Sequence, residues 1–586
     1  MRVHYPRTPH LPWSPGVSPD DVRAGDLSGL RGREVVVTEK LDGENTTLYP
    51  DGLHARSLDS AHHPSRAWVK GLQGRIGARI PAGLRVCGEN VYARHSIAYE
   101  ELESWFYGFS VWDGERCLGW DRTVAFLREL GIPVPPVLWR GVFDERALRG
   151  VRLDPERQEG YVVRAAEGFA LADFAGRVAK WVRRNHVRTN THWMHAPVVP
   201  NGLGPGAALW SVRSGAQADV TALLTAVNLG PEPRDGAAPA AVDLGAEAVE
   251  GSAAEEVAEV AGRLDAIGRG GDARLAGVLA VALRPAPRAV LAARLARPLG
   301  MPLARRIADL AGLRDALRRP FPDEERRAGL GRMALAADLG VLHAVAAVTP
   351  AGSAEEAREQ VAWSALHAED AGLLGPDPLE PLRTGLRAGL AGLDGEAAGR
   401  CWAEARAAWA AGRIATPEEA VAATWRWRAG TFPRLVHLVG PSGSGKSTFA
   451  AGLTDTVHVS LDELRAARGS RAGRRDDGAV LGEGLDRLDA ALAAGGTVVW
   501  DATSLNHHQR SLVHAVARRR DALTTHVVVL LEQDELRRRN AARAAAVPAH
   551  VLDAQVRRYV PPYPGQAHRT WYVGERGTVD DRDGDL

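Results

Sequence analysis

Lysine is scarce in this 586-residue chain. Lys40, Lys70, Lys180 and Lys446 are the four lysines among 73 lysine and arginine residues. Arginine stays protonated in proteins, whereas a lysine can lose its proton and become an amine nucleophile. Each lysine that this arginine-rich chain retains is therefore a candidate for chemistry that arginine performs poorly.

Cysteine and long apolar runs are also scarce. The three cysteines, Cys87, Cys117 and Cys401, stand far apart without C-x-x-C spacing, which argues against a disulfide framework or a zinc site. The N-terminal residues lack the apolar core of a signal peptide, and no uninterrupted apolar run approaches membrane-spanning length. We therefore expect a cytoplasmic protein that has no membrane partner.

The chain also lacks a charge excess. Its net charge is +1 and its charged content is 25%, which is typical of ordinary globular proteins. These values argue against a strongly basic, histone-like binder, so any contact with nucleic acid has to come from local patches. The length predicts roughly three to four domains.

The texture of the sequence changes along the chain. Residues 1–200 mix short β-branched and aromatic runs with Gly, Asp and Pro turns, which predicts a mostly antiparallel α+β domain. Residues 201–252 have the composition of loop and linker around one helix, and 253–428 predict about eight helices and no strands. Residues 432–586 alternate strands and helices, which predicts an α/β domain with a parallel sheet.

A phosphate-binding loop opens the last region. The segment GPSGSGKS, Gly440 to Ser447, fits GxxxxGK[ST] and follows the apolar strand RLVHLV. Its backbone N–H groups can wrap phosphates, Lys446 can reach the β and γ phosphates, and Ser447 can hold Mg²⁺. The predicted nucleotide-binding residues here are Gly440, Ser442, Gly443, Gly445, Lys446, Ser447 and Thr448.

Acidic and basic residues follow the next strands. VHVSLDELR places Asp462 at a strand end, where it can act as general base, with Arg465 three residues later for an acceptor phosphate. The segment TVVWDATSLNHHQR adds four acceptor-site candidates, Asp501, Thr503, Asn506 and Arg510. Arg539 and Arg543 lie four residues apart and can form a lid over the transferred phosphate.

This set of motifs resembles the polynucleotide 5′-kinase branch of the P-loop phosphotransferases. The resemblance covers about residues 432–575 and implies ATP-dependent phosphorylation of a 5′-hydroxyl with Asp462 as base. Small-molecule kinases use the same scaffold, so the reaction is better defined than the substrate.

The N-terminal region contains K-x-D-G at Lys40 to Gly43, a short motif that is weak alone. Ordered residues downstream strengthen it. Arg56 follows in HARS, Glu89 can bind a ribose hydroxyl, Phe109 can stack on a base, Glu159 can hold a metal, and Lys180 can meet the α-phosphate. With Asp42, Gly43 and Asn45, they form the predicted nucleotide site around Lys40.

The ordered set resembles the covalent nucleotidyltransferases, which comprise DNA ligases, RNA ligases and mRNA capping enzymes. The resemblance implies that Lys40 attacks the α-phosphorus of ATP and carries AMP as a lysyl phosphoramidate, which needs a neutral amine. A helix-rich region, not an OB-fold pattern, follows, and only 39 residues precede Lys40. Both points favour RNA ligase, and TEKLDGENTT and GENVYARHSI resemble the bacteriophage-type RNA ligases found in bacteria.

Together the two regions predict an RNA repair enzyme that uses ATP and Mg²⁺ or Mn²⁺ and acts on broken RNA or tRNA ends. A DNA-directed kinase-ligase and a nucleotide-dependent RNA-binding sensor remain as alternatives. The helical region has two histidines, His343 and His367, and no His-Asp dipeptide, so it does not fit an HD-type phosphohydrolase. Any healing of 3′ ends is expected to need a separate phosphatase or phosphodiesterase. Lys70 has no motif, and we expect it on a solvated face.

Overall fold

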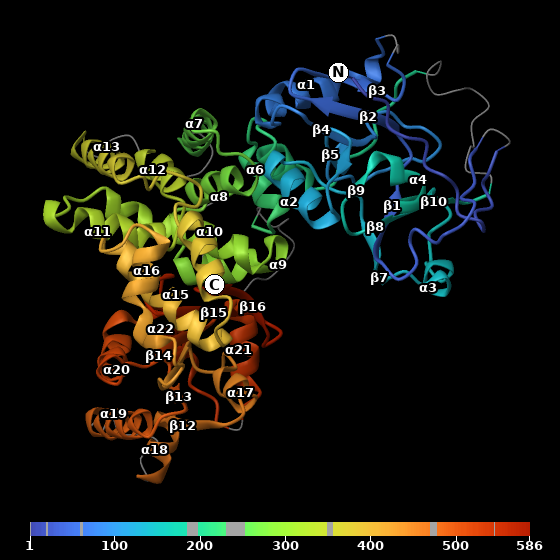
Figure 1. Cartoon of the computed structure of the whole chain (residues 1–586). Coiled ribbons are helices and arrows are strands. Elements are labelled where there is room, and N and C mark those ends of the chain that lie inside the picture. Colours follow the sequence, from blue (N-terminus) through green and yellow to red (C-terminus); the bar gives the residue numbers. More distant parts are fainter. Residues whose placement is uncertain are drawn as a thin grey trace. The chain divides into compact units, whose positions relative to one another are not determined.

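The computed structural model divides into two compact units, which are described separately (Figure 1). The first unit comprises Met1–Asp235 and Ala261–Leu275, and the second comprises Gly236–Val260 and Ala276–Leu586. The structure describes residues 2–18, 21–58, 62–184, 197–229, 252–348, 355–468, 477–543 and 545–586.

Two antiparallel sheets form the centre of the first unit. One has the strand order β10-β8-β1-β7 and the other has the order β3-β2-β4-β5-β6-β9. The strands are β1 (Glu34–Lys40), β2 (Glu44–Tyr49), β3 (Gly52–Ala55), β4 (Leu84–Asn90), β5 (Phe106–Asp113), β6 (Arg116–Cys117), β7 (Val137–Val142), β8 (Gly160–Ala165), β9 (Phe169–Ala170) and β10 (Val178–Val182). The predicted antiparallel α+β architecture is confirmed.

Short helices cover these sheets. In α1 (Ala67–Ile76) the residues Val69, Leu72 and Ile76 recur at helical spacing and are buried against apolar residues of the second sheet. The other α-helices of this part are α2 (Trp120–Leu130), α3 (Glu145–Arg149), α4 (Phe174–Arg177), α5 (Ala207–Arg213) and α6 (Val220–Ala226). Two helices, α5 and α6, thus lie where the sequence indicated loop and linker around one helix.

The central region is helical, as expected, and its described residues contain no strand. It holds ten α-helices where the sequence pattern predicted about eight, because a helix break can be as short as Gly300 between α9 and α10. They are α7 (Ser252–Ala266), α8 (Gly271–Ala282), α9 (Arg288–Leu299), α10 (Met301–Leu317), α11 (Asp323–Ala334), α12 (Leu339–Ala347), α13 (Glu355–Asp370), α14 (Glu380–Leu390), α15 (Gly395–Ala410) and α16 (Pro417–Ala423). Helices α9 to α16 belong to the second unit.

A six-stranded sheet with order β12-β13-β11-β14-β15-β16 completes the second unit. All neighbours are parallel except β15 and β16. Its strands are β11 (Arg434–Val439), β12 (Thr456–Ser460), β13 (Thr497–Asp501), β14 (Leu523–Val529), β15 (Arg569–Val573) and β16 (Val579–Asp583). Its helices are α17 (Lys446–Ala451), α18 (Leu461–Ala467), α19 (Asp477–Ala493), α20 (His507–Arg519), α21 (Gln533–Ala541) and α22 (Ala549–Arg558).

No single helix among the described residues is long and apolar enough to cross a membrane. One helix pair, Glu325–Ala334 and Leu339–Ala347, passes on combined length and composition, and it is bent by 105°.

Candidate functional sites

The first candidate site is a cavity of about 880 Å³ in the first unit. Lys40 reaches it from the end of β1, and Lys180 reaches it from β10. Strand β8 lies between these two strands, so the antiparallel pairing brings together residues that are far apart in sequence. Seven predicted residues line the cavity: Lys40, Gly43, Asn45, Arg56, Glu89, Phe109 and Lys180.

Glu159 is the ion-pair partner of Lys40. Its Oε2 atom lies 2.5 Å from Lys40 Nζ in an ion pair, because Lys40 is paired with Gly160 at the start of β8. Burial alone would lower the pKa of Lys40, but the carboxylates of Glu159 and Glu89 raise it above the ordinary value. The lysine is therefore held as an ammonium ion in this state of the site.

The same cavity contains a carboxyl that is held partly neutral. Burial raises the pKa of Glu89 to about 8, although the Lys40 charge opposes the shift. Burial also lowers the pKa of Lys180, and the nearby Lys40 charge adds to that effect. Lys40 and Lys180 thus lie near the carboxyl groups of Glu159 and Glu89 in a site that is shielded from solvent. Such an arrangement is typical of sites that bind charged ligands.

Two further residues of the cavity wall, Asn45 and Gly43, have unusual surroundings. Asn45 Oδ1 is buried and has no hydrogen-bond partner among the described residues, so it is free to meet a ligand donor. A Cβ on Gly43 would lie 2.5 Å from the carbonyl oxygen of Asn90, so the backbones approach too closely for another residue. Carboxylate oxygens such as those of Glu159 and Glu89 are suitable ligands for Mg²⁺ or Mn²⁺.

Asp42 has a structural position that the sequence did not indicate. Its carboxylate accepts hydrogen bonds from the backbone N–H groups of Ser96 and Ile97, at 2.8 and 3.0 Å, and it is not part of the cavity wall. Asp42 therefore anchors the turn after Lys40, which makes it a positioning residue. Lys70 is exposed on α1, as expected.

The sequence analysis missed several residues of this wall. Tyr5 packs its ring edge-on against Phe109 at 5.3 Å between centroids, and the Arg164 guanidinium lies over the Phe109 ring, 5.7 Å from its centroid. Arg66 forms a two-contact ion pair with Glu44. These residues share no motif spacing with Lys40, so no signal in a single sequence identifies them.

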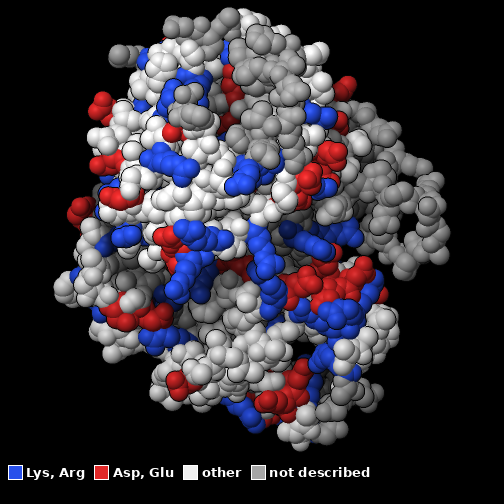
Figure 2. All heavy atoms as spheres, turned by 90° about the vertical axis from the view of Figure 1, so that its right-hand side faces the viewer, with Lys and Arg blue, Asp and Glu red and all other residues white. Residues whose placement is uncertain are grey.

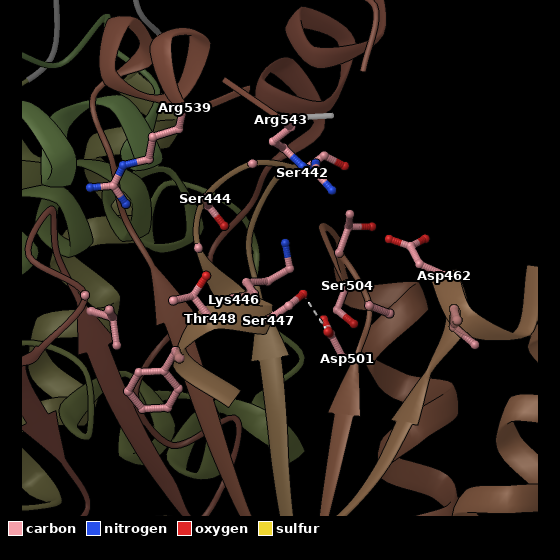
Figure 3. A pocket seen from close by; sticks show the side chains of 18 of the residues that line it. Ser442, Ser444, Lys446, Ser447, Thr448, Asp462, Asp501, Ser504, Arg539 and Arg543 are labelled. Atoms are coloured by element: carbon pink, nitrogen blue, oxygen red, sulfur yellow. Dashed lines mark hydrogen bonds between the residues drawn. The ribbon is translucent and has the colours of Figure 1, made fainter. Parts of the chain in front are cut away.

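The second candidate site is a cavity of about 750 Å³ at the carboxyl ends of the parallel strands in the second unit (Figure 3). The loop after β11 turns into α17, and the left-handed φ of Gly443 (78°) and Gly445 (97°) requires glycine at both positions. The cavity is lined by twelve predicted residues: Ser442, Gly443, Gly445, Lys446, Ser447, Thr448, Asp462, Arg465, Asp501, Thr503, Arg539 and Arg543.

Lys446 and Ser447 have the contacts of a phosphate and metal site. Lys446 Nζ donates to the carbonyl oxygen of Pro441 at 2.7 Å, and burial lowers its pKa to about 8 despite the attraction of Asp501 and Asp462. Ser447 Oγ donates to Asp501 Oδ2 at 2.7 Å (Figure 3). A hydroxyl and a carboxylate oxygen so close together suit a hard cation such as Mg²⁺.

Asp462 lies across the cavity, just inside α18, and its carboxylate accepts from Arg465 at 2.7 Å. Arg539 on α21 donates to Glu535 at 2.5 Å and also to the carbonyl oxygen of Glu575. Helix α21 ends at Ala541, so Arg543 lies beyond the helix and not on the predicted shared face. The lid candidates therefore come from a helix and from the segment after it.

Three predicted residues do not line this cavity. Gly440 starts the loop and donates its N–H to Thr503 O at 2.9 Å. Asn506 caps α20, where its side chain accepts from Gln509 N. Arg510 is 3% exposed and donates to the carbonyl oxygens of Ser504 and Val560, at 3.1 and 3.0 Å. The acceptor-binding prediction is corrected for Asn506 and Arg510, because both side chains are used to hold the backbone.

Several wall residues were not predicted. The turn between β15 and β16 contributes Glu575, Arg576 and Gly577, and Gln509 comes from α20. The turn carries no phosphate-binding motif that the sequence could show. It lies beside the phosphate-binding loop because of the order of the strands in the sheet. Figure 2 shows basic and acidic side chains interspersed on one face of the molecule, which fits the net charge of +1.

Comparison with known proteins gives each unit a family match. The model of the family described as RNA ligase matches residues 33–182, and the model described as an AAA domain matches residues 435–562. The first match spans Lys40 to Lys180, and the second spans the phosphate-binding loop and Arg543. The chain thus combines a domain that matches the RNA ligase family model with a P-loop domain that matches an AAA-domain model. No curated protein sequence matches the chain.

Solved structures that are similar to parts of the chain include an RNA ligase and a gluconokinase. A Naegleria gruberi RNA ligase mutant with AMP and Mn is 16% identical over 27% of this chain and 52% of its own, with TM-score 0.21. A gluconokinase from Sinorhizobium meliloti is 21% identical over 25% of this chain and 83% of its own, with TM-score 0.19. The chain therefore spans about half the length of the Naegleria ligase.

Proposed function

We propose that this protein heals and seals RNA ends. The P-loop domain phosphorylates a 5′-hydroxyl end, and the RNA-ligase-family domain joins the 5′-phosphate to a 3′-hydroxyl through a lysyl-AMP intermediate. The observation that carries the proposal is the position of Lys40, a scarce amine in a cavity that also contains Lys180, Glu89 and Asn45. The domain with the phosphate-binding loop would produce the 5′-phosphate that such a ligase needs.

In the ligase step, the Nζ–P bond to the α-phosphorus forms while the bond between the α-phosphorus and the bridging oxygen breaks, and pyrophosphate leaves. An oxygen of the RNA 5′-phosphate then bonds to the AMP phosphorus while the Nζ–P bond breaks and frees Lys40. The 3′-hydroxyl oxygen finally loses its proton and bonds to the 5′-phosphorus, and AMP leaves. The Lys40 ammonium has to lose its proton before it attacks. Lys180 would meet the phosphate charge, Glu159 would hold the divalent metal, which supplies charge neutralisation, and Glu89 would bind a ribose hydroxyl of the nucleotide.

In the kinase step, the 5′-oxygen forms a bond to the γ-phosphorus, the bond to the β-phosphate oxygen breaks, and ADP leaves. Asp462 would accept the hydroxyl proton, and Lys446 would bind the transferred phosphate. Ser447 and Asp501 would hold Mg²⁺. Arg539 would meet the phosphates through its NH1 group, which lies beside Gly445 of the loop, while its Nε stays paired with Glu535.

A substrate scan tests this proposal. RNA and DNA nicks and single strands, each with 5′-hydroxyl or 5′-phosphate and with 3′-hydroxyl or 3′-phosphate, would be incubated with ATP and Mg²⁺ or Mn²⁺. We expect sealing of RNA with a 3′-hydroxyl, sealing of 5′-hydroxyl RNA only when Lys446 is intact, and no sealing of 3′-phosphate ends without a separate phosphatase. Faster sealing of DNA nicks would support a DNA repair enzyme, and nucleotide binding without any sealing would support a sensor.

A further inference from the structure

Three histidines that line neither candidate site meet in the second unit. His437 on β11 and His526 on β14 are directly paired in neighbouring parallel strands, so their side chains project from the same face of the sheet. His514 on α20 lies against them. One ring nitrogen of each histidine lies within 4.8 Å of a ring nitrogen of each of the others.

The hydrogen bonds of the three rings leave ligand atoms unused. His514 Nε2 and His526 Nε2 lie 2.8 Å apart, and His437 Nε2 lies 2.8 Å from Ser504 Oγ. The side chains of His437 and His526 are fully buried, and the Nδ1 atom of each has no hydrogen-bond partner among the described residues. A buried nitrogen without a partner needs an explanation, and an ion bound to His437 Nδ1 is one for that atom; an ion held by the Nε2 pair would leave His526 Nδ1 unused.

The cluster has a route to solvent. His514 is half-buried and lines a cavity of about 500 Å³, together with Glu404, Asp521, Arg518 and His568. Basic residues, among them Arg400 and Arg518, line the same cavity as these two carboxylates. A dication here would be stabilised by a negatively charged fourth ligand entering from this cavity.

We propose that His437, His514 and His526 bind a transition-metal ion of the zinc type, with the fourth position open to solvent or an anion from this cavity. Zinc–nitrogen distances of about 2.0–2.1 Å place tetrahedral ligands roughly 3.3 Å apart. The 2.8 Å pair is about half an ångström shorter than that value, and the ligand atoms of all three rings lie within 4.8 Å of one another, so the rings would have to adjust around the ion. Three neutral imidazoles suit zinc, copper or nickel and not Mg²⁺.

The site would be linked to the kinase cavity through Ser504. Ser504 lines that cavity, has a left-handed φ of 46°, and is held by His437 through its hydroxyl. A non-glycine residue in this conformation is strained and depends on its contacts. A metal at the cluster would fix His437 and thereby the loop that follows Asp501.

Cobalt titration of the full chain tests the proposal. The protein would be stripped of metal and titrated with Co²⁺ in saturating Mg²⁺, which occupies the oxygen-ligand sites. We expect one Co²⁺ per chain with the strong visible absorption of a four-coordinate nitrogen site, and displacement by Zn²⁺. His514→Gln should weaken binding at least ~100-fold. His508→Gln is the matched control, because His508 is exposed on the same helix.

Absence of the absorption in the unmodified chain, or equal absorption in His514→Gln, would overturn the proposal. X-ray absorption of the unmodified chain with one equivalent of Zn²⁺ provides a second measurement that does not depend on a variant folding. A shell with three imidazole ligands supports the site, and a shell of oxygen ligands alone contradicts it.

Discussion

Lys40 Nζ and Glu159 Oε2 form an ion pair of 2.5 Å across 119 residues of sequence. The pairing of β1 with β8 creates this contact, because Lys40 ends one strand and Glu159 precedes the next. The ion pair holds the proposed nucleophile as an ammonium ion. Under the proposed mechanism, the Lys40 amine becomes neutral only after the Glu159 carboxylate has moved from Lys40 to another cation. A divalent metal would be such a cation.

Replacing Glu159 should make Lys40 more reactive as an amine. Glu159→Gln removes a carboxylate that raises the pKa of Lys40 and leaves burial, which lowers it. At pH 8 the neutral fraction of Lys40 then increases, about tenfold for each unit by which the pKa falls. Labelling with an amine-specific reagent, followed by peptide mass spectrometry, measures this fraction.

Lys70 is the internal reference for that experiment, because it is exposed on α1 and lies in the same digest. Its labelling should be the same in both proteins. A Lys40-to-Lys70 labelling ratio that does not change in Glu159→Gln would show that the ion pair does not control the amine.

Nucleotide binding at the phosphate loop should be linked to proton uptake. Burial lowers the pKa of Lys446 to about 8, and the phosphates bind its charged form. Below pH 7 the lysine is already protonated, so little proton is taken up, whereas binding at pH 8.5 should protonate most molecules. Calorimetry of ATP binding in buffers of different ionisation enthalpy measures the uptake, and no uptake at pH 8.5 would contradict the assignment.

Asp462 should affect phosphoryl transfer and not nucleotide binding. Asp462→Asn removes the proposed proton acceptor, so transfer of the γ-phosphate to a 5′-hydroxyl RNA should fall by about 10²–10⁴-fold. The Kd for ATP should change little. Glu463→Gln is the matched control, since Glu463 is the exposed neighbour on α18. Equal rates in the two variants would remove Asp462 from the mechanism.

Arg510 should stabilise the fold. Arg510→Gln removes buried hydrogen bonds to the carbonyl oxygens of Ser504 and Val560, so the free energy of unfolding should fall by about 1–3 kcal/mol. Arg518→Gln changes an exposed residue of the same helix and should have less than about 0.5 kcal/mol of effect. Urea unfolding measures both, and equal stability of the two variants would contradict this role.

The sequence predicts the part of this molecule that depends on local pattern. The alternation of apolar runs predicts the two kinds of sheet, and GxxxxGK[ST] and K-x-D-G identify Lys446 and Lys40. The sequence shows that Asn506 and Arg510 follow a strand closely, and this proximity led to their prediction as acceptor-site residues. The direction of their side chains depends on where α20 begins, which the strand pattern does not show. Asn506 does carry a local signal, since asparagine is a preferred helix N-cap.

Contacts between distant segments could not be predicted from one sequence. Tyr5 reaches Phe109, and His437 meets His514 and His526, through sheet order and helix packing that no spacing encodes. Helix boundaries in the central region also escape the pattern, because a single glycine separates α9 from α10.

The covalent adduct is the most direct test of the central claim. Intact-protein mass spectrometry after incubation with ATP and a divalent metal, without RNA, should show one AMP per chain on the unmodified protein and on Lys446→Ala. Peptide mapping should place it on Lys40, and Lys40→Arg should show none. No adduct on the unmodified protein, or an adduct that survives Lys40→Arg, would contradict the account.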